Sequence, residues 1–347
     1  WLFRPGGYMS CAVLYDDRRN SGATIVARLA SIGGSAPLFA FESFSARIGV
    51  DAPGVWSRDT LTSHLPPRST RVRPDRLDVV YRVGTERPQT ESGETEGSWR
   101  ISRGEEPLSR PSSRTEALRI LAHDLNFAVA LHARGWVFLH AGVVLHRGEL
   151  LLFPGASGWG KTTLVRELVS EGARYYSDDY APVDSQGRIH AYPRDLRVRG
   201  ENGFHDFPDP HAHEERPSKP ASAVYFLRHT SGDRQRTRPL SSGKALMLLL
   251  ENCAHARESP GRSISRLRHI VRGAEAWAGE RGDARETARQ LLADDRGPEE
   301  LRRSDGIVGT KERQPRALSL ATPARAPSPE SHWRRRLGSH DEKSQDE

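Results

Sequence analysis

Short apolar stretches between turn-forming residues predict strands in the first part of the chain. Residues 37–41 and 46–50 are strand-like, and residues 76–83 alternate roughly as a half-buried strand does until Gly84 ends the run. These segments predict a small β-rich module, for which we expect a scaffolding role without chemistry of its own.

Polar stretches mark the limits of this module. Residues 85–114 are rich in Glu, Ser, Gly and Pro, which indicates a loop or linker, so we assign the module and its linker to residues 37–110. Residues 1–36 show too little pattern for an assignment. The chain begins with Trp1 rather than Met, so a fragment of a longer protein is one interpretation.

Helical periodicity begins after the linker. Ser113 and Glu116 have the spacing of a capping box, and apolar residues then recur mostly at steps of three and four from Leu118 to Val129. Gly135 ends the pattern. The pattern predicts a helix that faces the core and carries no catalytic residue.

A strand, a glycine-rich loop and a helix follow in that order. The apolar runs at 136–140, 143–145 and 149–154 predict strands. After the loop, residues 162–171 place their apolar side chains on one helical face, and Gly172 is suited to end that helix.

The rest of the chain predicts two more strands and several helices. Residues 173–179 predict a short strand that ends in two carboxylates, and residues 223–227 predict another. Helical apolar faces occur at residues 245–256, 264–271 and 284–292. We assign residues 111–295 to one domain and expect residues 296–347, rich in Arg, Pro and Ser, to be a disordered tail.

The loop itself fits the pattern G-x-x-x-x-G-K-S/T at every position. Its glycines let successive backbone N–H groups turn toward phosphate, Lys161 brings a positive charge to the β- and γ-phosphates, and Thr162 offers a hydroxyl to Mg²⁺. The helix that follows directs its positive end at the anion. An ordinary glycine-rich turn would not explain Lys161 and Thr162. The predicted nucleotide-binding residues are Gly155, Ala156, Ser157, Gly158, Trp159, Gly160, Lys161, Thr162 and Thr163.

Two adjacent carboxylates, Asp178 and Asp179, are candidates for chemistry. Phosphoryl transfer needs one acidic residue to hold Mg²⁺ and another to orient or deprotonate the attacking group. A solvated turn is the alternative interpretation, but the nearby phosphate loop favours the catalytic one. His140 ends a strand of the same predicted sheet, although a single histidine beside apolar residues is more often structural.

Composition narrows the setting. Hydrophobic residues make up 36% and charged residues 28% of the 347 residues, which fits a compact middle part flanked by polar segments. No stretch approaches the roughly 20 apolar residues that span a bilayer, and no signal peptide is evident. Cys11 and Cys253 match no metal or redox spacing. We therefore expect a cytoplasmic protein with no membrane partner.

The net charge of +7 raises the question of nucleic-acid binding. The sequence has no helix-turn-helix cue, no zinc-finger spacing and no aromatic RNA-binding signature. Its basic residues are scattered apart from a run at 334–336. A solvated basic surface is the better interpretation, so we expect no nucleic-acid partner.

Together, His140, the loop at 155–162 and the aspartates at 178–179 resemble the catalytic core of HPr kinase/phosphorylase. The resemblance is clear over residues 136–200 and looser over the helices to about residue 293. The stretches similar to uncharacterised bacterial serine-kinase-like relatives of that family are residues 139–144, 154–155, 175–180 and 187–193.

The resemblance implies a mixed α/β fold like that of HPr kinase and phosphoenolpyruvate carboxykinase, with the phosphate loop between a strand and a helix. It implies ATP and Mg²⁺, and it suggests a ring-like homo-oligomer. It also implies that Asp178 is the base toward a substrate serine hydroxyl, that Asp179 helps to hold the metal, and that His140 lies near the phosphates.

Two positions depart from the family's pattern. The family has a Glu two residues before an Arg-Gly pair, and this chain has Arg197 at that position before Arg199 and Gly200. A cation in place of this carboxylate argues against a reverse phosphorylase activity and against HPr itself as the substrate. Trp159 is also bulkier than the usual loop residue.

The leading hypothesis is an ATP-dependent kinase that phosphorylates a serine hydroxyl on a protein, a peptide or a small molecule. Lys161, Asp178 and His140 are its catalytic candidates, and Thr162 and Asp179 are its predicted Mg²⁺ ligands. One alternative is a nucleotide-binding regulator without phosphoryl transfer, which Arg197 motivates. Another is a carboxykinase-like enzyme acting on a small acid, whose additional metal-ligating Lys and His pattern is not evident here.

Overall fold

A computed structural model describes residues 39–293, except for residues 53, 86–98, 195, 201–202, 208–215 and 232–235. Segments 1–36 and 296–347, including the predicted tail, lie outside the described residues. The described part is a mixed α/β structure with a six-stranded sheet, a seven-stranded sheet and a two-stranded hairpin. It belongs to one compact unit, and none of its helices is long and apolar enough to cross a membrane.

The six-stranded sheet comes from the predicted β-rich module and has the order β3-β1-β2-β4-β5-β6. Its elements are β1 (Phe39–Ser43), β2 (Ala46–Asp51), the short helix α2 (Arg58–Thr62), β3 (Thr70–Arg71), β4 (Val79–Thr85), β5 (Trp99–Arg103) and β6 (Glu106–Ser109). The three predicted strands are confirmed as β1, β2 and β4.

The linker predicted over residues 85–114 is wrong for residues 99–109, which form β5 and β6. Trp99 and Ile101 are buried and Arg100 between them is exposed, as expected of a strand that packs on one face. Only two apolar residues alternate with polar ones in this strand. That pattern is too short to distinguish a strand from the polar linker around it.

Helix α3 (Arg114–His132) covers one face of this sheet. The Ser113 hydroxyl accepts a hydrogen bond from the backbone N–H of Glu116, which confirms the predicted N-cap. The Glu116 carboxylate accepts from the backbone N–H of Ser112 rather than that of Ser113. The buried residues of α3 share a hydrophobic cluster with those of β1, β2, β4 and β5, so this helix packs on the sheet that precedes it.

The seven-stranded sheet has the order β10-β7-β8-β13-β15-β14, and β9 also pairs with β7. Its strands are β7 (Val137–His146), β8 (Glu149–Pro154), β9 (Arg174–Ser177), β10 (Tyr180–Val183), β13 (Ala223–His229), β14 (Arg236–Pro239) and β15 (Glu275–Arg281). Strand β13 runs parallel to both β8 and β15, whereas β7 is antiparallel to its neighbours. The separate hairpin consists of β11 (Leu196–Gly200) and β12 (Gly203–Phe207).

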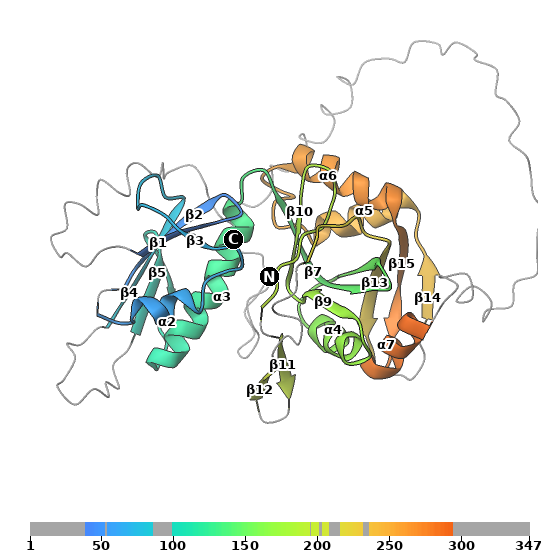
Figure 1. Cartoon of the computed structure of the whole chain (residues 1–347), viewed down its shortest axis with the longest axis horizontal. Helices are drawn as coiled ribbons and strands as arrows, with labels where there is room; N and C mark the ends of the chain where they lie inside the picture. The colour runs from blue at the N-terminus through green and yellow to red at the C-terminus, as the bar shows by residue number, and fades with distance from the viewer. Residues whose placement is uncertain are drawn as a thin grey trace, which may run out of the picture. The chain divides into compact units, whose positions relative to one another are not determined.

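Helices lie on both faces of this sheet (Figure 1). On one face are α4 (Lys161–Ser170) and α7 (Ala284–Ala293), and on the other are α5 (Ser242–Glu251) and α6 (Pro260–Gly273). Side chains of successive strand residues point to opposite faces of the sheet. Leu151 packs with α4 and α7, whereas Leu152 packs with α5 and α6. The result is a three-layer arrangement with a sheet between two helical layers.

Most elements predicted for this part are confirmed, with shifted ends. These are the loop helix, the strand at 223–227 and the three C-terminal helices. The predicted strands at 136–140 and 143–145 form one continuous strand, β7. The C-terminal part was expected to be helical, but it also contains β15, whose buried residues Ala276 and Trp277 form too short an apolar run to indicate a strand.

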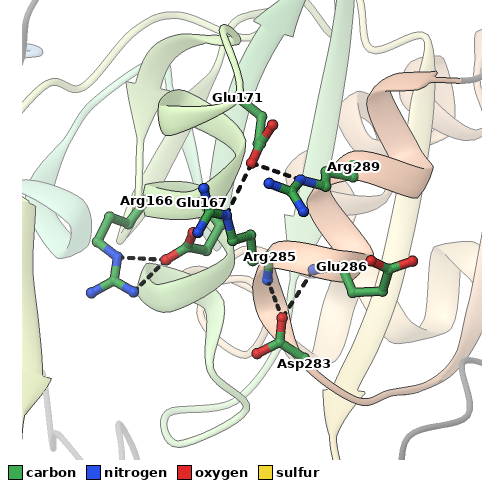
Figure 2. Close-up of polar contacts among 7 residues, drawn as sticks. All are labelled: Arg166, Glu167, Glu171, Asp283, Arg285, Glu286 and Arg289. Carbon is green, nitrogen blue, oxygen red and sulfur yellow. Dashed lines mark hydrogen bonds and ion pairs between the residues drawn. The ribbon is translucent and has the colours of Figure 1, made fainter.

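Polar contacts join the end of α4 to α7, as Figure 2 shows. One carboxylate oxygen of Glu171 accepts hydrogen bonds from Nε of Arg285 at 3.2 Å and Nε of Arg289 at 3.0 Å. Asp283 accepts from the backbone N–H groups of Arg285 and Glu286 and so caps the start of α7. These ion pairs at the surface each contribute little to stability.

A buried histidine predicts how stability depends on pH. His255 follows α5, is 4% exposed, and donates from Nε2 to the carbonyl of Leu131 at 3.0 Å. Burial lowers the pKa of His255 to about 4. The unfolded chain, with a histidine pKa of about 6.5, binds the extra proton between these two values, so folding stability falls as the pH is lowered through this window.

We expect His255 to lower the free energy of unfolding by about 2 kcal/mol between pH 7.5 and pH 5.0. Urea unfolding of the wild type and of His255→Gln at both pH values measures this contribution. The variant should lack that part of the pH dependence, and an equal loss of stability in both proteins would contradict the assignment.

Candidate functional site

Residues 140–142 of β7 connect the two halves of the candidate site. On one edge of β7, the backbone N–H of Gly155 donates to the carbonyl of His140 at 3.3 Å. On the other edge, the backbone N–H of Ala141 donates to the carbonyl of Asp179 at 3.0 Å. The start of the glycine-rich loop and the aspartate pair therefore flank the same short stretch of strand.

The aspartates occupy an interruption in the pairing along β7. Strand β10 pairs with the first half of β7, where Tyr180 lies opposite His140, and β9 pairs with the second half, where Ser177 lies opposite Val143. Residues 178–179 lie between the two ladders. This break removes the two residues from regular sheet pairing and brings their side chains to the site.

The loop at residues 155–160 connects the end of β8 to the start of α4. Gly158 and Gly160 have φ values of +86° and +79°, in the left-handed region that favours glycine. Gly160 is the N-cap of α4 and offers no side chain as an acceptor, so the first N–H groups of the helix are available to an anion.

Close packing brings this helix to the sheet. A Cβ atom on Gly142 would lie 2.6 Å from Cγ2 of Val165, a separation that real Cβ atoms essentially never show. Because Gly142 has no side chain, α4 can approach β7 directly beside the aspartate pair. A glycine within a strand often marks such a close approach.

Lys161 folds back across the loop. Its Nζ donates to the carbonyls of Gly155 at 2.8 Å and Ala156 at 3.0 Å, and the side chain is largely buried. The Trp159 ring lies against the same loop, since a Cβ atom on Gly155 would be 2.8 Å from Cε3 of Trp159. The bulky tryptophan thus packs on the first residue of the loop.

A buried arginine, which no pattern in the sequence singled out, supports the loop from behind. The guanidinium of Arg281, at the end of β15, donates to the carbonyls of Gly160 at 2.9 Å and Gly282 at 3.0 Å. The residue is only 2% exposed. It fixes the orientation of the peptide that begins α4 and places a positive charge behind the loop.

Asp178 lies next to Thr162. The carboxylate is buried and accepts a hydrogen bond from the Tyr175 hydroxyl at 2.9 Å, and the Thr162 side chain is near enough to lower its pKa slightly. Burial raises the pKa of Asp178 above its usual range, against the opposing effect of Arg194, and the charge of Asp179 adds to the rise. Asp178 is therefore the carboxyl of the pair with the higher proton affinity.

Asp179 contacts a different pair of side chains, His140 and Arg194. One oxygen lies 3.2 Å from Nε2 of His140, and the other lies 3.1 Å from a terminal nitrogen of Arg194. Burial alone would raise the pKa of Asp179, but Arg194 and then His140 outweigh burial and hold the pKa well below its usual range. Asp179 is anionic at neutral pH.

The predicted residues thus come together in pairings that differ in part from the expected ones. Thr162 was expected to share a metal with Asp179, but it contacts Asp178, while Asp179 contacts His140. Arg194 and Tyr175 were not selected as site residues, because nothing in the sequence separates them from surface or core positions. The side chain of Arg197 lies outside the part that the structure describes.

The oxygen atoms of Thr162 and Asp178 suit a hard cation. Mg²⁺ is usually held by one or two protein oxygens together with substrate phosphates rather than by an all-protein cage. Within residues 39–293 as described, no group of three or more His, Cys, Asp or Glu side chains could hold a metal ion. A Mg²⁺ ion that binds together with phosphates would fit this donor set.

Comparison with known proteins adds no assignment, because no protein-family model and no curated protein matches this chain. What the site does must be inferred from its geometry.

Two loop glycines allow a matched test of this geometry. Both have positive φ, so alanine at either position strains the backbone by about 1–2 kcal/mol. A Cβ atom meets nothing within 4 Å at Gly158, but it would lie 2.5 Å from the Arg281 guanidinium at Gly160. A hydrogen bond to a charged group contributes about 1.5–3 kcal/mol.

We expect Gly158→Ala to lower the free energy of unfolding by about 1 kcal/mol and Gly160→Ala to lower it by about 3 kcal/mol, measured by urea unfolding. Equal losses in the two variants would show that Arg281 does not support the loop.

Proposed function

We propose that this protein is an ATP-dependent kinase with an HPr kinase-like phosphate-loop core, and that it transfers the γ-phosphate of ATP to a serine hydroxyl. The observation that carries the proposal is the meeting of three parts on β7: a glycine-rich loop that precedes a helix, Lys161 within that loop, and Asp178 in contact with Thr162.

The loop supplies a site for the phosphates of ATP. The backbone N–H groups at the start of α4 and the positive end of that helix favour an anion. Lys161 is held by two loop carbonyls, and a bound phosphate would offer its ammonium group a stronger, charged acceptor. Arg281 adds a buried positive charge behind the same loop.

Thr162 and Asp178 would hold Mg²⁺ at the phosphates, since a hydroxyl and a carboxylate meet there. When bound, the ion would neutralise the negative charge that develops during phosphoryl transfer. This assignment replaces the expected pairing of Thr162 with Asp179, because the Asp179 carboxylate is engaged by His140 and Arg194.

Asp178 also suits the role of base. In the transfer step the acceptor oxygen bonds to the γ-phosphorus, the bond from that phosphorus to the β–γ bridging oxygen breaks, and ADP leaves. The hydroxyl proton passes to the Asp178 carboxylate and then to solvent. The carboxylate has two oxygen atoms, so one can face the metal while the other accepts the proton.

Asp179 has a positioning role in this proposal. Its carboxylate orients the side chains of His140 and Arg194. With their orientation set, both can face negative charge on the phosphates without a cost of reorganisation. Catalysis would consist mainly of positioning and electrostatics.

A nucleotide-binding regulator is the second candidate, and Arg197 is the observation that favours it. A cation at a position where the resembled family has a carboxylate is compatible with retained nucleotide binding and lost transfer. Such a protein would bind ATP through the same loop but would leave Asp178 without a catalytic role.

The proposal predicts which substitutions abolish phosphate transfer. We expect label from [γ-³²P]ATP to reach a component of a cell lysate in the presence of Mg²⁺ with the wild type. Lys161→Ala should reduce transfer by at least about 100-fold because it removes charge stabilisation, and Asp178→Asn by a similar factor because it removes the base.

Glu171→Gln is the matched control, since it changes an exposed carboxylate at the far end of α4 and should leave transfer within about twofold of the wild type. ATP binding that is lost only in Lys161→Ala, with no transfer by any protein, would contradict the kinase and leave the regulator.

A further inference from the structure

A surface cavity of about 550 Å³ lies against the segment that precedes Arg194. One wall comes from the turn before β3, another from the extended segment after β10, and a third from the segment before β13. Its volume falls in the range of about 300–1,000 Å³ that is typical of small-ligand sites. The lining residues that matter here are Pro67, Arg68, His190, Pro193, Arg216 and Ser218.

Two walls of the cavity connect directly to the aspartate pair. Pro193 is followed by Arg194, whose guanidinium contacts Asp179. On the second wall, Nε of Arg216 donates to the carbonyl of Tyr175 at 2.8 Å, and the Tyr175 hydroxyl donates to Asp178. Each of these two lining residues is therefore one step removed from a carboxylate: Pro193 precedes Arg194 in the chain, and Arg216 is hydrogen-bonded to Tyr175.

The lining is cationic. Arg68 and Arg216 both line the cavity, and among the lining residues that the structure describes there is no Asp or Glu. His190 is a further polar lining group, and its Nε2 lies 3.0 Å from Asp184. Ser218 is held in place by Arg188, which donates to its hydroxyl and its carbonyl. Two guanidinium groups in one concave site match the geometry of carboxylate and phosphate groups.

The backbone of Arg68 is strained. Its φ is +60°, in the left-handed region where glycine would be unstrained. Two serine hydroxyls hold the turn, since Ser43 donates to the carbonyl of Pro67 at 2.7 Å and Ser69 to that of Pro66 at 2.6 Å. The guanidinium carbon lies 5.2 Å from the centre of the Phe44 ring. A strained arginine fixed over an aromatic ring beside a cavity is typical of a binding residue.

From these observations we infer that the cavity is the acceptor site, and that the acceptor carries a carboxylate close to the hydroxyl that receives the phosphate. Arg68 and Arg216 bind that carboxylate, and the hydroxyl lies toward Asp178. Two sources supply this chemistry: a free hydroxy amino acid such as serine, and a peptide serine with acidic neighbours. The inference rests on the proposed kinase function, and it assigns to the β-rich module a part in acceptor binding.

A binding experiment tests the cavity without any catalysis. The probes are a fluorescent peptide with one serine between two aspartates and the same peptide with asparagines in place of the aspartates, titrated with the full chain in low salt. We expect the acidic peptide to bind at least about tenfold more tightly than the neutral one. Arg68→Gly should remove most of that difference.

Arg76→Gly is the matched control. Arg76 is also exposed and also has a positive φ, at +54°, but it is not among the cavity lining residues. The substitution therefore removes the same charge and a similar backbone strain from the segment between β3 and β4. Both variants should unfold at a temperature equal to or above that of the wild type, since glycine relieves the strained backbone.

Phosphate transfer from labelled ATP then identifies the source of the carboxylate. Free L-serine, the acidic peptide and the neutral peptide serve as acceptors, and Arg68→Gly should raise the KM of the preferred acidic acceptor at least about tenfold while the KM for ATP and kcat stay near wild type. Preference for free serine or for the acidic peptide, with this dependence on Arg68, supports the inference and names the source.

The outcomes separate a failure of the acceptor site from a failure of the proposed kinase function. Equal binding of the acidic and neutral peptides together with no preferred transfer to free serine, or an effect of Arg76→Gly as large as that of Arg68→Gly, overturns the acceptor site. Equal transfer to neutral and acidic acceptors also overturns it while leaving the kinase intact. Binding of the acidic peptide that depends on Arg68, without transfer to any acceptor, supports the carboxylate site and contradicts the proposed kinase.

Discussion

The pairing of both edges of β7 at residues 140–142 is the constraint on which the candidate site depends. One edge binds the first residue of the glycine-rich loop through the carbonyl of His140, and the other binds the carbonyl of Asp179 through the N–H of Ala141. Both are backbone hydrogen bonds in a buried strand, so they are obligatory rather than adjustable. Gly142 completes the arrangement because only glycine allows α4 to approach the strand this closely.

This constraint places two adjacent carboxylates in opposite electrostatic environments. Asp178 is buried beside Tyr175 and Thr162, and its pKa is raised, whereas Asp179 faces His140 and Arg194, and its pKa is lowered. Paired carboxyls whose environments separate their pKa values are suited to different roles in one reaction. The proposed division, with Asp178 at the metal and the acceptor proton and Asp179 as the residue that orients His140 and Arg194, follows from that separation.

The sequence was informative where chemistry demands particular residues and weak where packing decides. The glycine loop, Lys161, Thr162 and the aspartate pair could be selected because phosphate binding restricts the residues that fit, and helix α4 followed from its apolar face. Arg281 and Arg194 could not be selected, since a single arginine has no periodic context and its meaning comes from what folds against it. The pairing of Thr162 with Asp178 depends on the break between β9 and β10, which sequence spacing does not reveal. Strands β5 and β15 were missed because two buried residues among polar ones form too weak a pattern.

The claim that the loop and the aspartate pair form one site is tested most directly by the effect of Mg²⁺ on ATP binding. Isothermal titration of ATP with and without Mg²⁺ would compare the wild type with Asp178→Asn and Asp179→Asn. If Asp178 and Thr162 hold the ion at the phosphates, Mg²⁺ should tighten ATP binding at least about tenfold in the wild type, and Asp178→Asn should lose most of that gain. Asp179→Asn should retain it. An unchanged Mg²⁺ effect in Asp178→Asn, or no ATP binding by the wild type, would contradict the account.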